Sequence, residues 1–313
     1  MRSWAKQHAA PQQVDVLLFD EFSALCLANT VEPLRAANAL AGLDLYHWRF
    51  LTLDGGPATS SSGMQVTAHG RVGDCRGDML IAMPSYRFQD LAGPTARSLR
   101  AASKRWHTMA GFDTGSWLLA AAGLLDGARA TIHWEELEQF AEAFPEVDVT
   151  RERHVIDGNR VTCSGAQAAF DLMVALIGQR QGQALRLEVA TLFMSAAAAG
   201  PQDAPLARNR SVARAVSEMQ TNLEHPLTIR EIARRVGRSQ KDLEARVAQE
   251  LGATPQAIYR RLRLISARKL VLESDLPVAE IALRAGYQDA SAFTRAFREE
   301  FGQTPRQMRF PVR

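Results

Sequence analysis

The chain has 313 residues, enough for about two domains. With 46% hydrophobic and 23% charged residues it has an ordinary globular composition, which excludes a disordered, collagen-like or disulfide-stapled chain. No apolar run approaches the ~18–20 residues that a membrane span needs, so we expect a soluble protein with no membrane partner. No secretory signal precedes Val14, and we expect a cytoplasmic location.

The formal net charge of +3 is unevenly distributed. Residues 1–207 carry 17 Lys and Arg against 22 Asp and Glu, or −5, whereas residues 208–313 carry 20 against 12, or +8. A basic region joined to an acidic one indicates an anionic partner for that region alone, most commonly nucleic acid. A solvated helical surface would explain the same charge.

The three cysteines, Cys26, Cys75 and Cys163, are odd in number and widely spaced. They form no CxxC pair and lack a neighbouring histidine at metal-ligand spacing. We therefore expect free thiols, no metal and no other cofactor.

The first two thirds of the chain alternate short β-type runs with helical patterns. The expected strands are Val14–Phe19, Trp48–Leu53, Met79–Met83, Trp106–Ala110 and Ala130–Trp134, with Val147–Arg151 and Arg160–Cys163 flanking a turn at Asp157–Asn159. Helices are expected over residues 30–41, 94–104, 116–124, 135–144, 165–179 and 185–194. Near-continuous apolar strands between helices predict an α/β domain with a mainly parallel sheet covered on both faces.

A linker follows this pattern. Residues 196–210 hold small residues and two prolines without apolar periodicity. We therefore predict a first domain over residues 13–196, a linker over 197–208 and a second domain over 209–313.

The second domain contains an internal repeat and no convincing strand. Leu227–Gly237 is matched 49 residues later by Leu276–Gly286, and the offset becomes 50 farther on. Each copy has the pattern of a helix-turn-helix, so we predict two such units, over residues 227–248 and 276–298. A helix over Pro255–Ser274, roughly 30 Å long, would separate them by nearly one DNA turn.

The run from Ile281 to Pro305 resembles the DNA-binding domain of the AraC/XylS family, which implies double-stranded DNA as a partner. The resemblance implies that Ser291, Ala292 and Arg295 face base edges, with Arg298 also on the DNA-binding surface. The first unit departs from the family pattern. Lys241 and Glu244 are the best remaining readers there, although Glu244 repels phosphates, and Arg246 stands where an apolar residue is usual.

In the first domain, Asp113 follows an apolar strand and opens a helix, as the nucleophile does in a strand-turn-helix elbow. With Asp126–Trp134, this stretch resembles the PfpI-like, class I glutamine amidotransferase-like superfamily, which implies a flavodoxin-like fold. Enzymes of that superfamily carry Cys at the elbow, and Asp113 is a far poorer nucleophile. Pro84 also lacks an amide donor where an oxyanion hole is expected. We therefore expect no catalysis.

The resemblance places Glu32 beside Asp113, and two carboxylates in one concavity favour a cationic ligand. We predict a ligand site of these two residues with His133, Trp134, Ser85 and Tyr86, because aromatic faces also attract cations. The resemblance implies sensing of amino-acid, betaine or carnitine-like metabolites. Alternatively, Asp113 caps its own helix, and Trp117 and Phe19 belong to the core.

Together these features favour a metabolite-responsive transcription regulator. The resemblance implies activation through RNA polymerase, and we expect a homodimer with an inducer of the amine, betaine or amino-acid class. The alternatives are an amidase or amidotransferase-like enzyme with an appended DNA-binding domain, and an architectural DNA binder without a ligand.

Overall fold

The structure, a computed structural model, describes residues 10–193 and 209–310. It divides into two compact units. The first comprises residues 10–38 and 43–176, and the second comprises residues 39–42 and the described residues from 177 onward. The predicted linker, residues 197–208, lies outside the described residues. None of the described helices is long and apolar enough to span a membrane.

The first unit is built on a seven-stranded sheet in the order β10-β11-β7-β6-β1-β2-β5. Its strands are β1 (Gln12–Leu18), β2 (Tyr46–Thr52), β5 (Gly70–Arg71), β6 (Gly77–Met83), β7 (Trp106–Phe112), β10 (His154–Asp157) and β11 (Arg160–Cys163). Every pairing is parallel except that of β10 with β11. This confirms the predicted α/β class.

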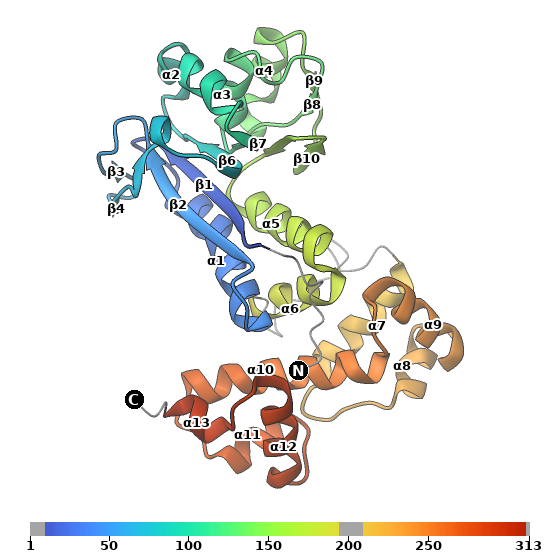
Figure 1. The fold of residues 1–313 in the computed structure, drawn as a ribbon. Coiled ribbons are helices and arrows are strands. Elements are labelled where there is room, and N and C mark those ends of the chain that lie inside the picture. The colour runs from blue at the N-terminus through green and yellow to red at the C-terminus, as the bar shows by residue number, and fades with distance from the viewer. Residues whose placement is uncertain (1–9, 194–208, 311–313) are drawn as a thin grey trace. The chain divides into compact units, whose positions relative to one another are not determined.

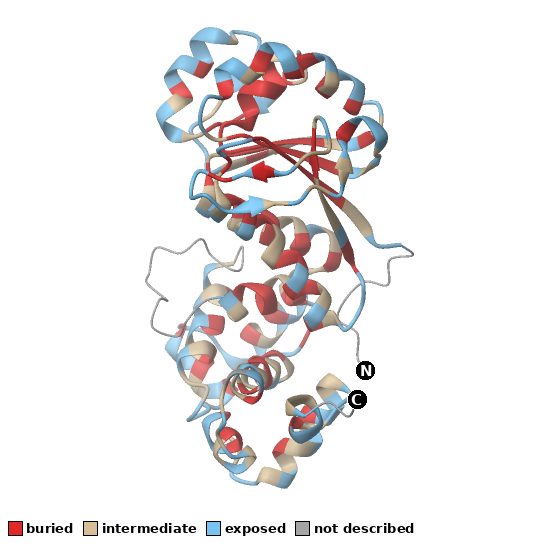
Figure 2. Cartoon of the chain, turned by 90° about the vertical axis from the view of Figure 1, so that its left-hand side faces the viewer, coloured by how far each residue is buried: buried red, intermediate tan, exposed pale blue. Residues whose placement is uncertain are grey.

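Helices cover both faces of this sheet (Figure 1). One layer consists of α2 (Phe88–Ala102), α3 (Gly115–Ala121) and α4 (Leu137–Ala143), and the opposite face carries α1 (Ala24–Ala41) and α5 (Ala166–Gln181). Side chains such as Leu80, Leu118 and Phe140 are fully buried between the sheet and the first layer. Because both faces are covered, the central strands are buried along most of their length (Figure 2).

The edge beyond β7 differs from the prediction. The expected strand over 130–134 is only β8 (Arg129–Ala130), and a 3₁₀ turn begins at Trp134. The expected strand over 147–151 is β9 (Asp148–Val149), which pairs with β8 in a separate small sheet. The hairpin partner of β11 is β10, which the prediction omitted because this edge strand buries only Val155 of its four residues.

Short elements complete the first unit. They are β3 (Ala58–Thr59), β4 (Gln65–Val66), η1 (Val72–Asp74) and η2 (Trp134–Glu136). β3 and β4 pair antiparallel beside the end of β2 and turn the chain back toward the sheet.

The described residues of the second unit form helices joined by loops, and no strand. Its helices are α6 (Gln183–Phe193), α7 (Arg210–Thr221), α8 (Ile229–Arg235), α9 (Gln240–Leu251), α10 (Pro255–Glu273), α11 (Val278–Arg284), α12 (Ala290–Phe301) and α13 (Pro305–Arg309). The pairs α8–α9 and α11–α12 are the two predicted helix-turn-helix units, and α10 joins them (Figure 1).

Local chemistry explains where these helices begin. Thr254 and Thr304 accept backbone hydrogen bonds at the starts of α10 and α13, and a proline follows each in the first turn. The turns within the two units contain Gly237 at φ 70° and Gly286 at φ 73°, a conformation that glycine adopts without steric cost.

Helix α6 packs onto the helix-turn-helix core. Leu187 is buried in the cluster that α7 to α10 form around the first helix-turn-helix unit. Beside it, Glu188 accepts a hydrogen bond of 2.7 Å from Arg261 of α10, and Arg261 also pairs with Glu300 of α12. Burial raises the pKa of Glu188 to about 7, against the opposing effect of Arg261. One guanidinium thus connects α6, α10 and α12.

Candidate functional site

Backbone strain in the first unit gathers at the carboxyl edge of the sheet. The non-glycine residues with positive φ in the described chain are Glu21 (63°), Arg87 (54°) and Asp113 (61°). They follow β1, β6 and β7, which are neighbours in the sheet. Strained backbone commonly clusters at functional sites, and ligands of parallel sheets bind at this edge.

The turn from β7 into α3 has the tight geometry of a nucleophile elbow. A Cβ on Gly111 would lie 2.5 Å from the backbone nitrogen of Ser116, and one on Gly115 would overlap the carbonyl oxygen of Ala82. Only glycine allows strand and helix to approach this closely. Asp113 occupies the position between them.

Asp113 is buried, with 6% of its surface exposed. The Ser85 hydroxyl donates to its Oδ2 at 3.2 Å, and the backbone N–H of His133 donates to its carbonyl oxygen at 3.1 Å. Burial raises the pKa of Asp113, whereas His133 and Ser85 lower it. The N-cap of α3 is Thr114 without a side-chain hydrogen bond. The structure thus brings Ser85, Asp113 and His133 together.

Glu32, the other predicted carboxylate, pairs elsewhere. It lies on α1, where Nε of Arg35 donates to it at 2.7 Å. Among the described residues, the groups of α1 that interact with Asp113 include Cys26, whose pKa is raised by burial first and then by Cys163 and Asp113. In the described chain, neither Glu32 nor Asp113 lines the pocket next to this elbow.

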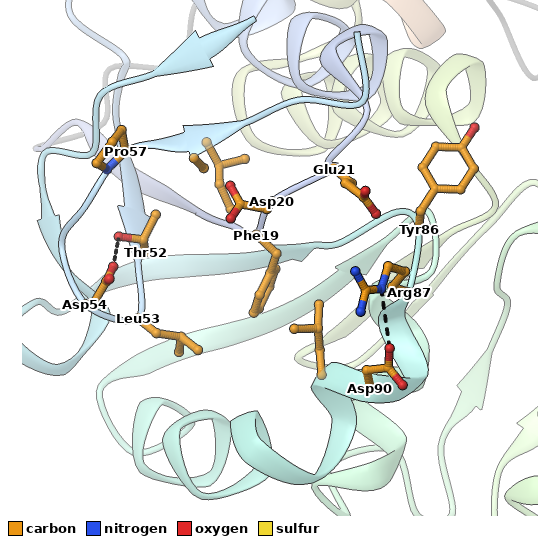
Figure 3. A pocket seen from close by; sticks show the side chains of 13 residues that line it. Phe19, Asp20, Glu21, Thr52, Leu53, Asp54, Pro57, Tyr86, Arg87 and Asp90 are labelled. Atoms are coloured by element: carbon orange, nitrogen blue, oxygen red, sulfur yellow. Dashed lines mark hydrogen bonds and ion pairs between the residues drawn. The ribbon is translucent and has the colours of Figure 1, made fainter. Parts of the chain in front are cut away.

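A pocket of about 660 Å³ opens beside Tyr86 at the same edge (Figure 3). Its wall comes from the ends of β1 and β2, the start of β3, the segment that follows β6 and the first turn of α2. The lining residues are Leu18, Phe19, Asp20, Glu21, Thr52, Leu53, Asp54, Pro57, Ala58, Tyr86, Arg87, Asp90 and Leu91. Of the predicted ligand residues, Tyr86 lines this pocket.

The pocket is acidic. Asp20, Glu21, Asp54 and Asp90 line it against one guanidinium, that of Arg87, which pairs with Asp90 at 3.5 Å (Figure 3). Hydrogen bonds from Gly56 and Thr52 lower the pKa of Asp54, so this carboxylate is ionised near neutral pH. The backbone N–H of Thr59 donates to Asp20 at 2.9 Å, which fixes a second carboxylate.

The prediction overlooked these carboxylates, although the sequence contains a signal for them. Asp20 and Glu21 come two and three residues after β1, and Asp54 comes two residues after β2. Carboxyl ends of neighbouring parallel strands meet at one edge, so acidic residues at strand ends are candidates for one site.

The remaining predicted residues of the first unit take different environments. Trp134 is 67% exposed, away from the pocket lining. Trp117 is buried against Phe88, Phe140 and Phe144, which confirms that it belongs to the core. Phe19 is buried but also lines the pocket.

The three cysteines are free, and the two buried ones are poorly reactive. Cys26 and Cys163 are buried, and burial raises the pKa of Cys163 to about 12. Thiols in such surroundings are inert, because the thiolate is the nucleophile. No group of three or more His, Cys, Asp and Glu residues in the described chain has the arrangement of a metal site.

In the second unit, α9 and α12 are the candidate recognition helices. Residues 241–250 and 291–300 have the same sequence of buried, intermediate and exposed positions. Leu243 and Val247 occupy the buried positions of the first helix, and Phe293 and Phe297 those of the second. Repeated packing therefore presents corresponding faces of the two helices outward.

The outward residues of the two helices differ. On α12, Ser291, Arg295 and Arg298 are exposed and Ala292 is half-buried. This is the side of α12 opposite its buried phenylalanines, as DNA reading requires.

On α9, Lys241 is exposed, but Glu244 accepts hydrogen bonds from Gln240 at 2.9 Å and Gln256 at 3.4 Å. Arg246, at the normally apolar position, pairs with Asp242 at 2.9 Å. Polar groups of the first recognition helix are thus partly paired with one another and with Gln256 of α10.

Comparison with known proteins supports both units. The chain matches the DJ-1/PfpI family over residues 12–179 and a helix-turn-helix domain over residues 232–310. It is 37% identical to the HTH-type transcriptional regulator CdhR of Pseudomonas aeruginosa, over 94% of this chain and 90% of the relative. It is 35% identical to the HTH-type transcriptional regulator GlxA of Rhizobium meliloti, over 95% of each chain.

A solved structure agrees. An AraC family transcriptional regulator from Pseudomonas putida matches with a TM-score of 0.53 and 25% identity, over 59% of this chain and all of that one. The chain therefore belongs to the family of HTH-type transcriptional regulators that join a DJ-1/PfpI domain to a C-terminal AraC-type helix-turn-helix domain.

Proposed function

We propose that this regulator responds to a small cationic metabolite of the amine, betaine or amino-acid class, which binds in the acidic pocket of the first unit. The observation that carries the proposal is four carboxylates against one guanidinium, itself paired with Asp90. A volume of about 660 Å³ is in the usual range for small-molecule sites. Tyr86 and Phe19 add aromatic surface, which attracts cations.

Ligand binding changes the regulator only if the ligand has different affinities for two states of the protein. We propose that the ligand-bound state activates transcription through RNA polymerase, as a homodimer in the cytoplasm. The resemblance to AraC/XylS proteins supports this part of the proposal. In vitro transcription with and without ligand tests it, and a ligand that lowers transcript yield would contradict activation.

The ligand is sought by a thermal-shift screen of the full chain against amines, betaines and amino acids. A ligand at ~100 times its dissociation constant adds ~2.7 kcal/mol of stability. Calorimetric titration of the best compound then compares wild type with Asp20→Asn and Asp54→Asn. Each variant should bind several-fold more weakly, because charge-assisted contacts are about twice as strong as neutral ones.

Asp44→Asn is the matched control, because it removes the same charge from an exposed loop position outside the pocket lining. Asp113→Asn and Glu32→Gln test the site predicted from sequence. Weak binding in these two variants with normal binding in the pocket variants would move the ligand to the elbow. An anionic ligand indifferent to all four would contradict the cation proposal.

We further propose that the first unit has no amidase or amidotransferase activity. Asp113 occupies the nucleophile position, and the buried thiols of Cys26 and Cys163 have raised pKa values. Assays with amide and glutamine substrates should show no turnover. Turnover that persists after all three cysteines are replaced but disappears in Asp113→Asn would indicate a carboxylate-based reaction instead.

A further inference from the structure

A second concave surface lies within the helix-turn-helix unit, where its two halves meet over α10. This groove has a volume of about 600 Å³. Its lining residues are Pro226, Leu227, Thr228, Ile229, Arg230, Gln240, Gln256, Tyr259, Arg260, Arg263, Tyr287 and Ala296. The lining includes three arginines, Arg230, Arg260 and Arg263, and no carboxylate from the described residues.

Two hydrogen-bond donors of the groove have no protein partner among the described residues. Nε of Arg263 and the hydroxyl of Tyr287 are both buried and lack a hydrogen bond. The Arg263 guanidinium lies over the Tyr287 ring, 4.5 Å from its centre, so the two groups are held together. Buried polar groups are normally hydrogen-bonded, so two unpartnered donors on residues of one groove fit an acceptor-rich anion.

The rim of the groove adds two positively charged arginines that are not held in strong ion pairs. Arg230 is exposed, and among the described residues the ion pair of Arg260 is a long contact of 3.7 Å with Glu299, in which both side chains are at least half exposed. Exposed ion pairs of this kind contribute little to stability, so Arg260 can exchange Glu299 for an anion that binds in the groove.

The position of the groove indicates which anion it binds. Gln240 is the first residue of the recognition helix α9, and Ala296 lies in the middle of the recognition helix α12. When two such helices occupy successive major grooves, the sugar-phosphate backbone between those grooves crosses the space between the helices. Phosphate contacts from arginine and tyrosine set the register of a protein on DNA.

We propose that this groove binds a backbone phosphate of the DNA segment between the two major-groove sites. Arg263 and Tyr287 donate to the phosphate, and Arg230 and Arg260 attract it from the rim. The proposal rests on DNA binding by the two helix-turn-helix units and adds a third contact region to them. This phosphate contact carries no base specificity.

The test measures binding of the full chain to a selected operator and to a random duplex, by fluorescence anisotropy over a series of salt concentrations. The variants are Arg230→Gln, Arg260→Gln and Tyr287→Phe. Each arginine variant should weaken binding to both duplexes by the same factor. If it removes one phosphate contact, the slope of log affinity against log salt should fall in magnitude by about 0.9.

Arg284→Gln is the matched control, because Arg284 is exposed on α11, pairs with Glu280 and lies outside the groove lining. It should leave the slope unchanged. Unchanged slopes in both rim variants, or an equal change in the control, would overturn the proposal. If wild type binds neither duplex, DNA binding itself fails, which is a different result.

Methylphosphonate substitution locates the contact without relying on the stability of any variant. A neutral linkage placed between the two major-groove sites should weaken wild type but have little further effect on Tyr287→Phe and Arg260→Gln, since partners in one contact are non-additive. Fully additive losses at every linkage would contradict a shared contact.

Two other occupants are distinguished in the same experiments. If millimolar inorganic phosphate raises the melting temperature of wild type but not of Arg260→Gln, while DNA binding is equal in both, the groove is a free-phosphate site. If the variants bind DNA normally but lose transcription, it contacts RNA polymerase. Either outcome would overturn the proposal.

Discussion

The two helix-turn-helix units have the same pattern of buried positions in their recognition helices and differ in their exposed side chains. Their recognition helices bury the same positions, yet Glu244 of the first is hydrogen-bonded by Gln240 and Gln256, whereas Arg295 of the second is exposed. Burial constrains a side chain through volume and shape, and exposure does not. A repeated sequence therefore specifies a repeated fold without specifying repeated recognition.

Corresponding glutamates, fifty residues apart, show the same divergence. Glu250 accepts the backbone N–H of Asn209 at 3.2 Å, at the start of α7. Glu300 pairs with Arg261, which also holds Glu188. The first recognition helix is therefore fastened to the start of the domain, and the second to α10 and α6.

The largest expected difference between the units concerns their turn glycines. A Cβ on Gly286 would overlap Pro226 and lie 2.8 Å from the carbonyl oxygen of Leu223, whereas a Cβ on Gly237 meets nothing within 4 Å. Gly237→Ala should cost about 1 kcal/mol for the positive φ. Gly286→Ala should cost about 2–4 kcal/mol, since overpacking adds ~1–3 kcal/mol to the cost of the positive φ. Denaturant unfolding of both variants checks this, and equal losses would contradict the difference in packing.

The second prediction concerns Glu188, which Arg261 connects to Glu300 of the second helix-turn-helix unit. Because the pKa of Glu188 rises from about 4.5 in the unfolded chain to about 7 in the folded one, the native state binds the extra proton between these values. Stability should therefore fall as pH rises through this window, by up to about 3 kcal/mol, and stay level above it. Arg261 and Glu300 face this carboxylate from α10 and α12.

Glu188→Gln keeps an acceptor for Arg261 but cannot ionise. Its stability relative to wild type should rise between pH 5 and pH 8, measured by denaturant unfolding at each pH. A constant difference across this range would show that Glu188 does not titrate there.

The third prediction compares base reading by the two helices. Arg295→Ala should cost ~1–3 kcal/mol on the operator and relax preference at one base pair. Lys241→Ala should cost less and affect operator and random DNA equally. Competition binding against a library of single-base operator variants measures both. If Arg295→Ala weakens all sequences equally, Arg295 contacts phosphate, and the resemblance misassigns it.

The smallest effect is expected at Glu244. Glu244→Gln removes a negative charge from the DNA-facing helix while keeping its hydrogen-bonding shape, so binding to random DNA should tighten by less than about 1 kcal/mol. The same anisotropy titrations detect this change. A loss confined to one operator base would instead identify Glu244 as a reader of cytosine.

The sequence predicts the framework of both units because their patterns are local. The two helix-turn-helix units, α10, and strands β1, β2, β6, β7 and β11 all appear where expected. β10 was missed because an edge strand lacks the apolar signal. Side-chain partners depend on the rotation of a helix, which explains why Glu32 pairs with Arg35 while Cys26 of the same helix interacts with Asp113.

Pairings between residues far apart in the chain are harder to predict from the sequence. Glu188 and Arg261 are 73 residues apart and belong to helices that look ordinary in the sequence. The acidic pocket combines three strand ends, and only the strand order shows that they are neighbours. Predicting such sites requires the topology first and the side chains second.

The contact between Gly286 and Pro226 has a consequence for the operator. The turn of the second helix-turn-helix unit packs against Pro226, on the segment that leads into the first helix-turn-helix unit. Helix α10, about 28 Å long, sets the distance between the same two units. DNA turns once in 10–10.5 base pairs, so each base pair inserted between the two half-sites rotates one against the other by roughly 35°. We therefore expect the protein to respond to helical phase as well as to sequence, because five inserted base pairs would place the second half-site on the opposite side of the duplex.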